Sequence, residues 1–438
     1  LGLMASAHAA LAMTLGLLGH SVLAFEVVES DLESRFTYGH GIEDNQSSEA
    51  SLTLLPRLGA SFGNSLWLEA SARIRMDAAD ELEPKEPRYD SYSAASAPWT
   101  FNDEGSAELR DFYLNWNIGN SQLRLGKQQI VWGSLDGVKV LDQMNPQSFR
   151  EFILADFEDS RINLWSAYLD TRIGAWRAEL VWTPDTTSHD IPESGAWFEF
   201  QAPRFRYGAE PGSPLPEITT DLPTSMTEDA TYGLRLSRQI GNFDLRLQAQ
   251  SGLDYEPLGR VRVSQSGVVL EQYYERREVY GLSFEGALGG VVLRGETAFQ
   301  PQRDFNTRTE LGLDSNEADQ WTAALAMDIY GPWNTFINAQ YVYDTVFNES
   351  ESLVRPSNDH IATVFLRRSF AYDELIAELR WYGTLDEGDG LARASLSWIL
   401  TDTVTINFGS DVFWGNDDGL FGQFADRDRV SATIRISF

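Results

Sequence analysis

The side chains that usually perform acid–base or metal chemistry are scarce in this sequence. Its 438 residues include five histidines and no cysteine. A chain without cysteine has no disulfides, thiolate metal sites, iron–sulfur clusters or covalently attached haem. Acid–base catalysis most often uses histidine, and beyond residue 24 the sequence offers only His40, His189 and His360. His360 follows Asp359, but no serine stands at a spacing typical of a hydrolase triad, so the sequence predicts neither an enzyme nor a bound cofactor.

Carboxylates outnumber cations by a wide margin. The chain has 65 Asp and Glu against 34 Lys and Arg, a formal net charge of −31. Binding to nucleic acid requires a basic surface, so a nucleic-acid partner is excluded. The run Asp386-Glu387-Gly388-Asp389 offers oxygens of the kind that calcium prefers, yet it lacks the ligand spacing of an EF-hand. We therefore predict solvated acidic loops without a bound metal.

One stretch, residues 142–160 (DQMNPQSFREFILADFEDS), combines charges with a short apolar pattern. Asn145-Pro146 has the form of a helix N-cap followed by proline at the first helical position. Phe149 and Phe152 would then lie on one helical face. We predict a short helix here that these two phenylalanines anchor, so that the charged side chains between and after them meet a passing solute.

The connection that contains this stretch, 133–159, is too apolar for a free surface loop. We expect it to fold inward as a constriction or lid. Loops of this kind narrow a pore and impose charge selectivity, whereas a lid that packs on the rim for stability alone is the alternative. The residues assigned to the constriction or lid are Asp136, Lys139, Asp142, Asn145, Pro146, Phe149, Arg150, Glu151, Phe152, Asp156, Glu158, Asp159 and Arg161.

Most of the remaining chain alternates apolar and polar residues with period two. In 243–250 (FDLRLQAQ) and 391–400 (LARASLSWIL) one face is apolar and the other polar. Segments of about ten such residues are typical of strands between lipid and a wet lumen. Eight short turns alternate with nine longer connections, among them 185–228 and 302–318, which gives 18 strands, with 16 as the alternative. Residues 25–438 are therefore predicted to be all-β, a transmembrane antiparallel up-and-down β-barrel.

The polar faces of these strands carry charges of both signs. Inside a wide barrel, opposite charges on neighbouring strands would pair and stiffen the wall, or line the path of a solute, and the two roles can coexist. The residues predicted to line the lumen wall are Arg124, Arg177, Glu179, Arg235, Arg246, Arg294, Glu296, Glu378, Arg380, Arg393 and Arg435.

Both ends of the sequence fit export to a bacterial outer membrane. Residues 1–24 are small and apolar, and their last residues fit a signal-peptide cleavage site before Phe25. The sequence ends in Phe438 on the apolar face of a strand, which resembles the terminal signature that the barrel-assembly machinery recognises. We predict a cleaved signal peptide, a location in the outer membrane, and contact with outer-membrane lipid and lipopolysaccharide.

A family resemblance covers residues 108–165. The resembling pieces are R-L-G-K-Q-Q-I-V-W-G (124–133), L-D-Q-M-N-P (141–146), F-R-E-F (149–152) and D-F-E-D-S-R-I (156–162). Together they resemble a large family of proteobacterial outer-membrane proteins known only as a domain of unknown function, and more loosely the alginate-export and phosphate-selective porins. The resemblance implies an outer-membrane barrel. It also implies an inner-membrane transporter as a partner, because family members are associated with transporters of the resistance–nodulation–division type.

These observations leave several functions open. The preferred one is a porin-like channel that moves a small or hydrophobic solute across the outer membrane. The runner-up is the outer-membrane component of a lipid or hydrophobic-compound transport system, in which Phe149, Phe152 and Phe157 would line the path. An outer-membrane enzyme and a scaffold around a cytochrome are further alternatives, and neither has a motif of its own in the sequence.

Overall fold

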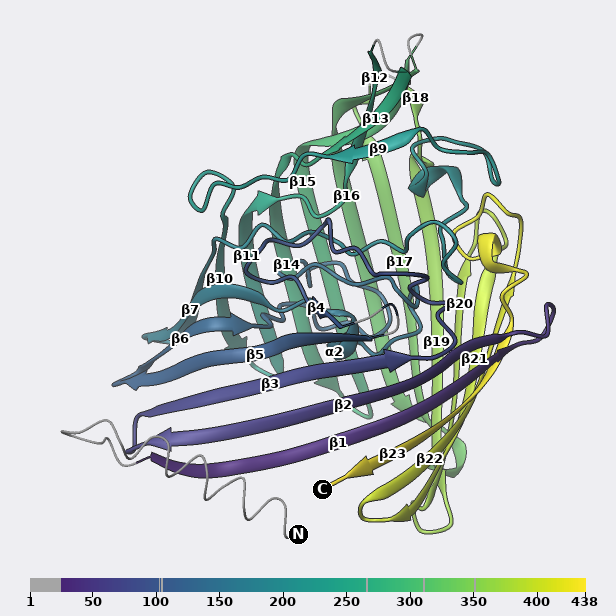
Figure 1. Cartoon of the computed structure of the whole chain (residues 1–438). Helices are drawn as coiled ribbons and strands as arrows, with labels where there is room; N and C mark the ends of the chain where they lie inside the picture. Colours follow the sequence, from purple (N-terminus) through teal and green to yellow (C-terminus); the bar gives the residue numbers. More distant parts are fainter. Residues whose placement is uncertain (1–24, 102, 104, 265–266, 310–311, 350–351) are drawn as a thin grey trace.

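The main sheet of the described chain forms a closed antiparallel barrel (Figure 1). The computed structural model describes residues 25–438 except 102, 104, 265–266, 310–311 and 350–351. The main sheet has 20 strands, of which β4 (Trp99–Thr100) and β18 (Ser352–Leu353) are two-residue additions and the other 18 form the wall. The first and last wall strands pair antiparallel and close the ring. Closure matters because an unpaired backbone group in hydrocarbon costs several kcal/mol.

The wall strands follow the chain order around the ring. They are β1 (Phe25–Gly41), β2 (Ser47–Phe62), β3 (Leu66–Asp77), β5 (Gly105–Ile118), β6 (Ser121–Gln128), β7 (Leu164–Ile173), β8 (Trp176–Thr183), β10 (Thr231–Ile240), β11 (Phe243–Leu253), β14 (Arg276–Leu288), β15 (Val291–Thr309), β16 (Gly312–Tyr330), β17 (Phe336–Phe347), β19 (Asn358–Phe370), β20 (Leu375–Thr384), β21 (Gly390–Thr401), β22 (Val404–Trp414) and β23 (Arg429–Ser437). The predicted fold class and the count of 18 are confirmed, and 16 strands are excluded.

The two faces of the wall differ in chemistry as the alternation predicts. Leu396 and Trp398 of β21 point outward and are exposed, whereas Ser395 and Ser397 line the interior. Trp333 lies at a short turn with 78 % of its surface exposed, at the level where an interfacial aromatic belt is expected. No helix within the described part of the chain is long and apolar enough to cross a membrane.

The prediction of a long loop over 302–318 is wrong. β15 and β16 continue as a ladder whose last pair is Thr309 with Gly312. The composition there is polar, but alternate side chains such as Phe305 and Leu313 are buried. Leu313 packs on a three-stranded sheet of β9 (Glu217–Thr220), β12 (Leu258–Ser264) and β13 (Gly267–Tyr273). This second sheet supplies the apolar surface that keeps a polar segment in strand form.

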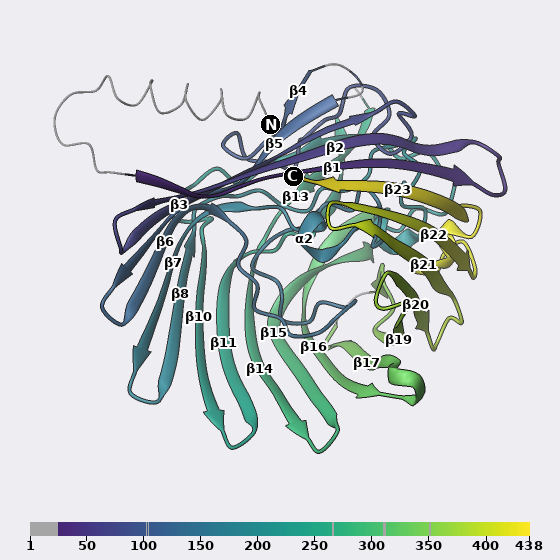
Figure 2. The same cartoon turned by 90° about the horizontal axis from the view of Figure 1, so that it is seen from below.

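The long connections between strands fold into the ring. Viewed from below, the one-turn helix α2 (Phe157–Ser160) lies inside the circle of strands (Figure 2). It belongs to residues 129–163, which connect β6 to β7 and which we call the inserted loop. Its neighbour in the interior is the connection 184–230 between β8 and β10.

Candidate functional site: a lumen divided by an inserted loop

The first half of the inserted loop covers one side of the inner wall. Leu135, Val140 and Leu141 pack in a cluster with inward-facing residues of β14 to β17, most of them alanine or valine. Gly281 lies directly beneath, and a Cβ added there would meet Leu141 at 2.5 Å. The same holds for Gly233 on β10, where a Cβ would meet Trp132 at 2.6 Å. Small side chains on the wall are therefore what lets the loop lie against it.

Charged wall residues hold this half of the loop in place. The carboxylate of Glu296 accepts hydrogen bonds from the Ser134 hydroxyl at 2.9 Å and from the Leu141 amide at 3.0 Å. Arg294 pairs with Asp136 of the loop at 2.9 Å. These two predicted lumen residues, Arg294 and Glu296, thus contact the loop, which puts them in a structural role.

The helix predicted to start at Asn145-Pro146 is not formed. The Asn145 side chain instead joins the two limbs of the loop, because it accepts a hydrogen bond from the Ile130 amide and donates one to the Ile162 carbonyl, both at 2.8 Å. An asparagine used in this way cannot cap a helix. Within the inserted loop, residues 129–163, the α-helical turn is α2, whose N-cap position is Asp156.

Phe149 and Phe152 form an aromatic anchor in the middle of the loop, without the predicted helix. Phe152 is 4 % exposed, and its ring centroid lies 4.7 Å from that of Phe424 in an aromatic cluster with residues of β20 to β22. Phe149 packs against Phe200 at 5.9 Å and His189 at 5.3 Å. The anchor therefore joins the inserted loop to the connections that follow β8 and β22.

Buried ion pairs surround this anchor. Arg150 is 6 % exposed and pairs with Asp77 at 3.1 Å and with Glu83 at 2.5 Å. Burial alone would raise the pKa of Glu83, but the positive charges of Arg150 and Arg75 hold that pKa below its usual value. Glu151 in turn lies 3.4 Å from Arg429 of β23. The ion pairs thus connect the loop to β3, near the start of the chain, and to β23, the last strand.

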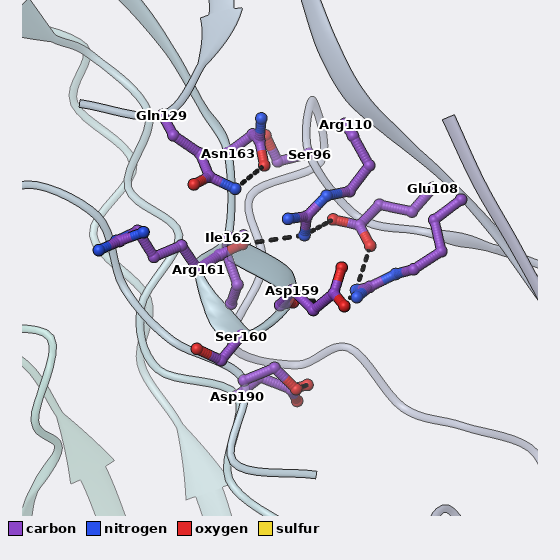
Figure 3. A network of polar contacts seen from close by, with 12 residues as sticks. Ser96, Glu108, Arg110, Gln129, Asp159, Ser160, Arg161, Ile162, Asn163 and Asp190 are labelled. Atoms are coloured by element: carbon purple, nitrogen blue, oxygen red, sulfur yellow. Dashed lines mark hydrogen bonds and ion pairs between the residues drawn. The ribbon is translucent and has the colours of Figure 1, made fainter. Parts of the chain in front are cut away.

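Two arginines of the wall fix α2 through its backbone (Figure 3). Arg73 donates to the Asp159 carbonyl at 3.0 Å, and Arg110 donates to the Arg161 carbonyl at 2.9 Å. Glu108 lies between the two guanidinium groups, 2.6 Å from Arg73 and 3.5 Å from Arg110. The charge of the pair is therefore partly neutralised, and the helix is held at a fixed distance from β3 and β5.

The remaining loop residues of the predicted set have defined places. Asp142 and Arg161 pair at 2.5 Å inside the loop, and the Pro146 carbonyl accepts a bond from the Ile162 amide at 2.9 Å. Lys139 lies 4.7 Å from the Phe157 ring, and burial lowers its pKa to about 8. Side chains of this set that are exposed within the barrel are Asp136, Asp156 and Glu158.

A cavity of about 460 Å³ remains between the loop and the opposite wall, formed by β1 to β3 and β20 to β23. Serine, threonine and asparagine side chains line much of this wall. Eight arginines and six carboxylates also line the cavity: Arg35, Arg73, Arg75, Arg150, Arg380, Arg393, Arg429, Arg435, Glu49, Glu151, Asp156, Asp159, Glu378 and Asp411.

The predicted lumen residues fall into separate places. Glu378, Arg380, Arg393 and Arg435 line this cavity, where Arg393 pairs with Asp411 at 2.8 Å. Arg177, Arg235 and Arg246 line a second cavity of about 590 Å³ at the short-turn end, and Arg124 lines a third of about 320 Å³. Glu179 is buried and pairs with Arg235 at 2.5 Å.

Six charged residues of the wall that line the cavity were missed by sequence reasoning. For most of them, period two on strands already recognised would have been a sufficient signal. Arg429, for example, shares its face of β23 with Arg435, which was predicted. The six residues are Arg35, Glu49, Arg73, Arg75, Asp411 and Arg429.

A carboxyl group ties the inserted loop to the neighbouring connection. Asp190 accepts a hydrogen bond from the Ser148 hydroxyl at 2.7 Å, and its backbone bonds to Gln147 and Phe149 at 2.9 and 2.8 Å. Burial and the nearby charge of Glu83 raise the pKa of Asp190 to about 7. A raised pKa in the folded state means that the group stabilises the contact at low pH, and that this stabilisation is lost between about pH 4 and about pH 7.

Asp190→Asn is therefore expected to remove a pH dependence of the loop contact. In the unmodified protein, amide hydrogen exchange at 147–149, corrected for intrinsic rates, should be faster at pH 8 than at pH 5. The variant mimics the neutral acid and should exchange slowly at both. Asp426→Asn, an exposed carboxyl 63 % accessible on an outer connection, is the control and should behave as the unmodified protein. Equal pH dependence in all three proteins would contradict this role of Asp190.

Several solved structures have the same fold. Acinetobacter baumannii OccAB1 matches with a TM-score of 0.52 and 7 % identity over 93 % of this chain and 95 % of that one. OccAB3 of the same organism matches with 0.52 and 9 % over 95 % and 100 %. Pseudomonas aeruginosa OccK5 (OpdH) matches with 0.50 and 10 % over 93 % and 96 %. At such identities the likeness concerns the fold alone, which is that of outer-membrane porins.

Sequence comparison assigns the chain to a family. No curated protein is detectably related to it. One family model matches residues 74–328, which is more than half of the chain and includes the whole inserted loop. The chain therefore belongs to the family described as "Protein of unknown function (DUF1302)".

Proposed function

We propose that this protein is an outer-membrane channel for small polar solutes and that the inserted loop is its constriction. The observation that carries the proposal is the cavity of about 460 Å³ between the loop and the hydroxyl- and arginine-bearing wall. A ring of this many strands is too wide for its own side chains to fill, so it leaves an aqueous path unless another element narrows it. The inserted loop narrows it without filling it.

Charge is distributed across the cavity in a way that suits selection. The loop presents the carboxylates of Asp156 and Asp159, while the wall presents Arg380, Arg393 and Arg435. Opposite charges on two sides of a narrow passage orient a dipolar or charged solute as it passes. The loop is therefore suited to control selectivity as well as the width of the path.

The apolar side chains of the loop do not support a lipid path. Phe149 and Phe152 pack in the aromatic cluster, and Phe157 lies between Lys139 and Arg161 at 4.7 and 5.6 Å. In the described part of the chain, none of these three rings lines the cavity of about 460 Å³. The polar lining favours a polar solute over a hydrophobic one.

An outer-membrane location is part of the proposal. It is supported by the porin-type fold and by the apolar outer face. Outer-membrane lipid, lipopolysaccharide and the assembly machinery would then be its partners. The proposed signal peptide, 1–24, lies outside the described residues.

Chemical labelling of the lumen tests whether the cavity is the conducting path. Because the chain has no cysteine, Ser395→Cys creates a single thiol that faces the cavity. Leu396→Cys is the matched control, since the next residue on β21 points outward and is 41 % exposed. A charged methanethiosulfonate reagent should reduce the current through the first variant in planar bilayers and leave the second unchanged. A current unaffected in both variants would refute conduction through this cavity.

A further inference from the structure

We propose that the cavity recognises an oxyanion, a carboxylate or phosphate group of the solute, and that Arg380 and Arg393 form the binding subsite. The inference deepens the proposed function, since the solute reaches this subsite through the lumen. β20 and β21 are in a register that places the two arginines directly opposite each other, and both line the cavity. Like charges directly opposite on neighbouring strands are unfavourable unless an anion lies between them.

The fixed carboxylates supply only part of that negative charge. Asp411 accepts from Arg393 Nε at 2.8 Å with one oxygen and from Arg429 Nε at 2.9 Å with the other, so Arg393 shares this carboxylate with Arg429, which also has Glu151 at 3.4 Å. Glu378 is 3.6 Å from Arg380, which is beyond hydrogen-bond distance. The row that crosses β20 to β23 therefore contains three arginines and one aspartate.

Both guanidinium groups are available to a solute. The Arg380 side chain is 37 % exposed and that of Arg393 is 25 % exposed, whereas Arg429 is 6 % exposed. Arg380 stacks over the Phe365 ring at 4.5 Å, which fixes the plane of its guanidinium. Among the described residues, Arg393 makes hydrogen bonds only through Nε. Two planar guanidinium groups that line the same cavity are suited to bind a carboxylate or phosphate in a bidentate manner.

A second opposed pair lies nearer the short-turn end. Arg35 of β1 is directly opposite Arg435 of β23, and Arg435 has 44 % of its side chain exposed. Along β23, Arg435 lies about 20 Å from Arg429, which is in the row of the first pair, at ~3.3 Å per residue. Ser431 and Thr433 line the cavity between the two pairs and carry hydroxyl groups. An anion that leaves the first pair therefore meets hydroxyl groups and then a second pair of arginines, which already has ion pairs with Glu33 and Asp159.

The lumen thus differs in sign from the protein as a whole. The chain has a formal charge of −31, yet this cavity contains eight arginines and six carboxylates. The outer acidic loops would repel an anion, so recognition must come from the arginines at close range. At 0.15 M salt the Debye length is about 8 Å, which makes the local pair more important than the distant loops.

Anion binding to the detergent-solubilised full chain tests the subsite without requiring conduction. Inorganic phosphate and acetate are titrated separately by calorimetry at low salt into three proteins. These are the unmodified protein, the lumen variant Arg380→Gln/Arg393→Gln, and a control variant with the same change in charge. The control is Arg260→Gln/Arg262→Gln on the β12 hairpin, where both arginines contact Glu271 outside the lumen. We expect the unmodified protein and the control to bind the anions. The lumen variant should bind them at least about tenfold more weakly. Absence of binding of both anions, or equal binding by the lumen variant, would overturn the proposal.

The two anions and a lysine variant refine the result. Binding of phosphate alone or acetate alone assigns the subsite to that group, and binding of both assigns it to oxyanions in general. Arg380→Lys/Arg393→Lys keeps the charge and loses the planar fork, so it should remain weaker than the unmodified protein. Full recovery with lysine would overturn bidentate recognition. Binding without any conductance in bilayers would refute the channel and leave the subsite, whereas conductance without binding would refute the subsite alone.

Discussion

Replacing Phe152 with alanine is expected to release the inserted loop and increase single-channel conductance. The ring is 4 % exposed among Phe200, Phe421 and Phe424, and removal of a buried phenylalanine costs about 3–5 kcal/mol. The residue also has a φ of 51°, a left-handed backbone conformation that persists only where packing enforces it. Loss of the ring therefore removes both the contact and the reason for the backbone geometry.

Conductance in planar bilayers measures this effect, because a detached loop widens the path and fluctuates. Phe408→Ala is the control, since Phe408 points outward from β22 and is 52 % exposed. The control should fold and conduct as the unmodified protein. If Phe152→Ala folds as a barrel and its conductance and current noise are unchanged, Phe152 is not the anchor of a constriction.

Arg150→Met is expected to weaken the loop by a comparable amount, for an electrostatic reason. The variant leaves Asp77, Glu83 and Glu151 without the cation that they share, and breaking a buried ion pair on one side costs about 3–5 kcal/mol. Arg150 depresses the pKa of Glu83, so the pairing contributes stability above the usual pKa of a glutamate. That contribution is lost as the pH falls through the depressed value.

The difference between Arg150→Met and the unmodified protein should therefore be largest at neutral pH and shrink below about pH 4. Hydrogen exchange of the loop amides at pH 7 and at about pH 3 measures it. Arg88→Met provides the comparison, because its pair with Glu193 is exposed at the arginine (69 %) and should be worth about 0–1 kcal/mol. A difference that grows on acidification would contradict the assignment of Arg150 as the shared counter-ion.

Local patterns predicted the wall of this protein well. In a strand between lipid and water, successive side chains face the two environments in turn, so the sequence alternates between apolar and polar residues. The eight short turns and the inward faces of β21 and β23 follow directly from period two. Residues 361–370 alternate only weakly between apolar and polar side chains, yet they belong to a regular strand, β19. Its pattern is weak because Ile361 points inward against the loop cluster and Phe365 supports Arg380.

Tertiary contacts decided what the local patterns could not. Asn145 has the neighbours of an N-cap, yet its side chain joins two limbs of a loop, and no single-segment pattern contains that information. From the sequence, Glu296 could not be distinguished from the other charged residues of the lumen. In the structure the inserted loop folds over β15, and Glu296 holds the loop by accepting a hydrogen bond from the Leu141 amide. Only Gly233 and Gly281 carried a hint of the covering loop, since glycine in a strand interior often marks close approach of another segment.

The most direct test of a channel constricted by the inserted loop is single-channel conductance before and after removal of residues 133–159. A short glycine–serine linker replaces the segment, and circular dichroism confirms that the barrel is retained. The unmodified protein should give small, resolved openings, and the shortened protein should give openings of several times the conductance with weaker ion selectivity. Absence of openings in both proteins, or equal conductance in both, would contradict the account.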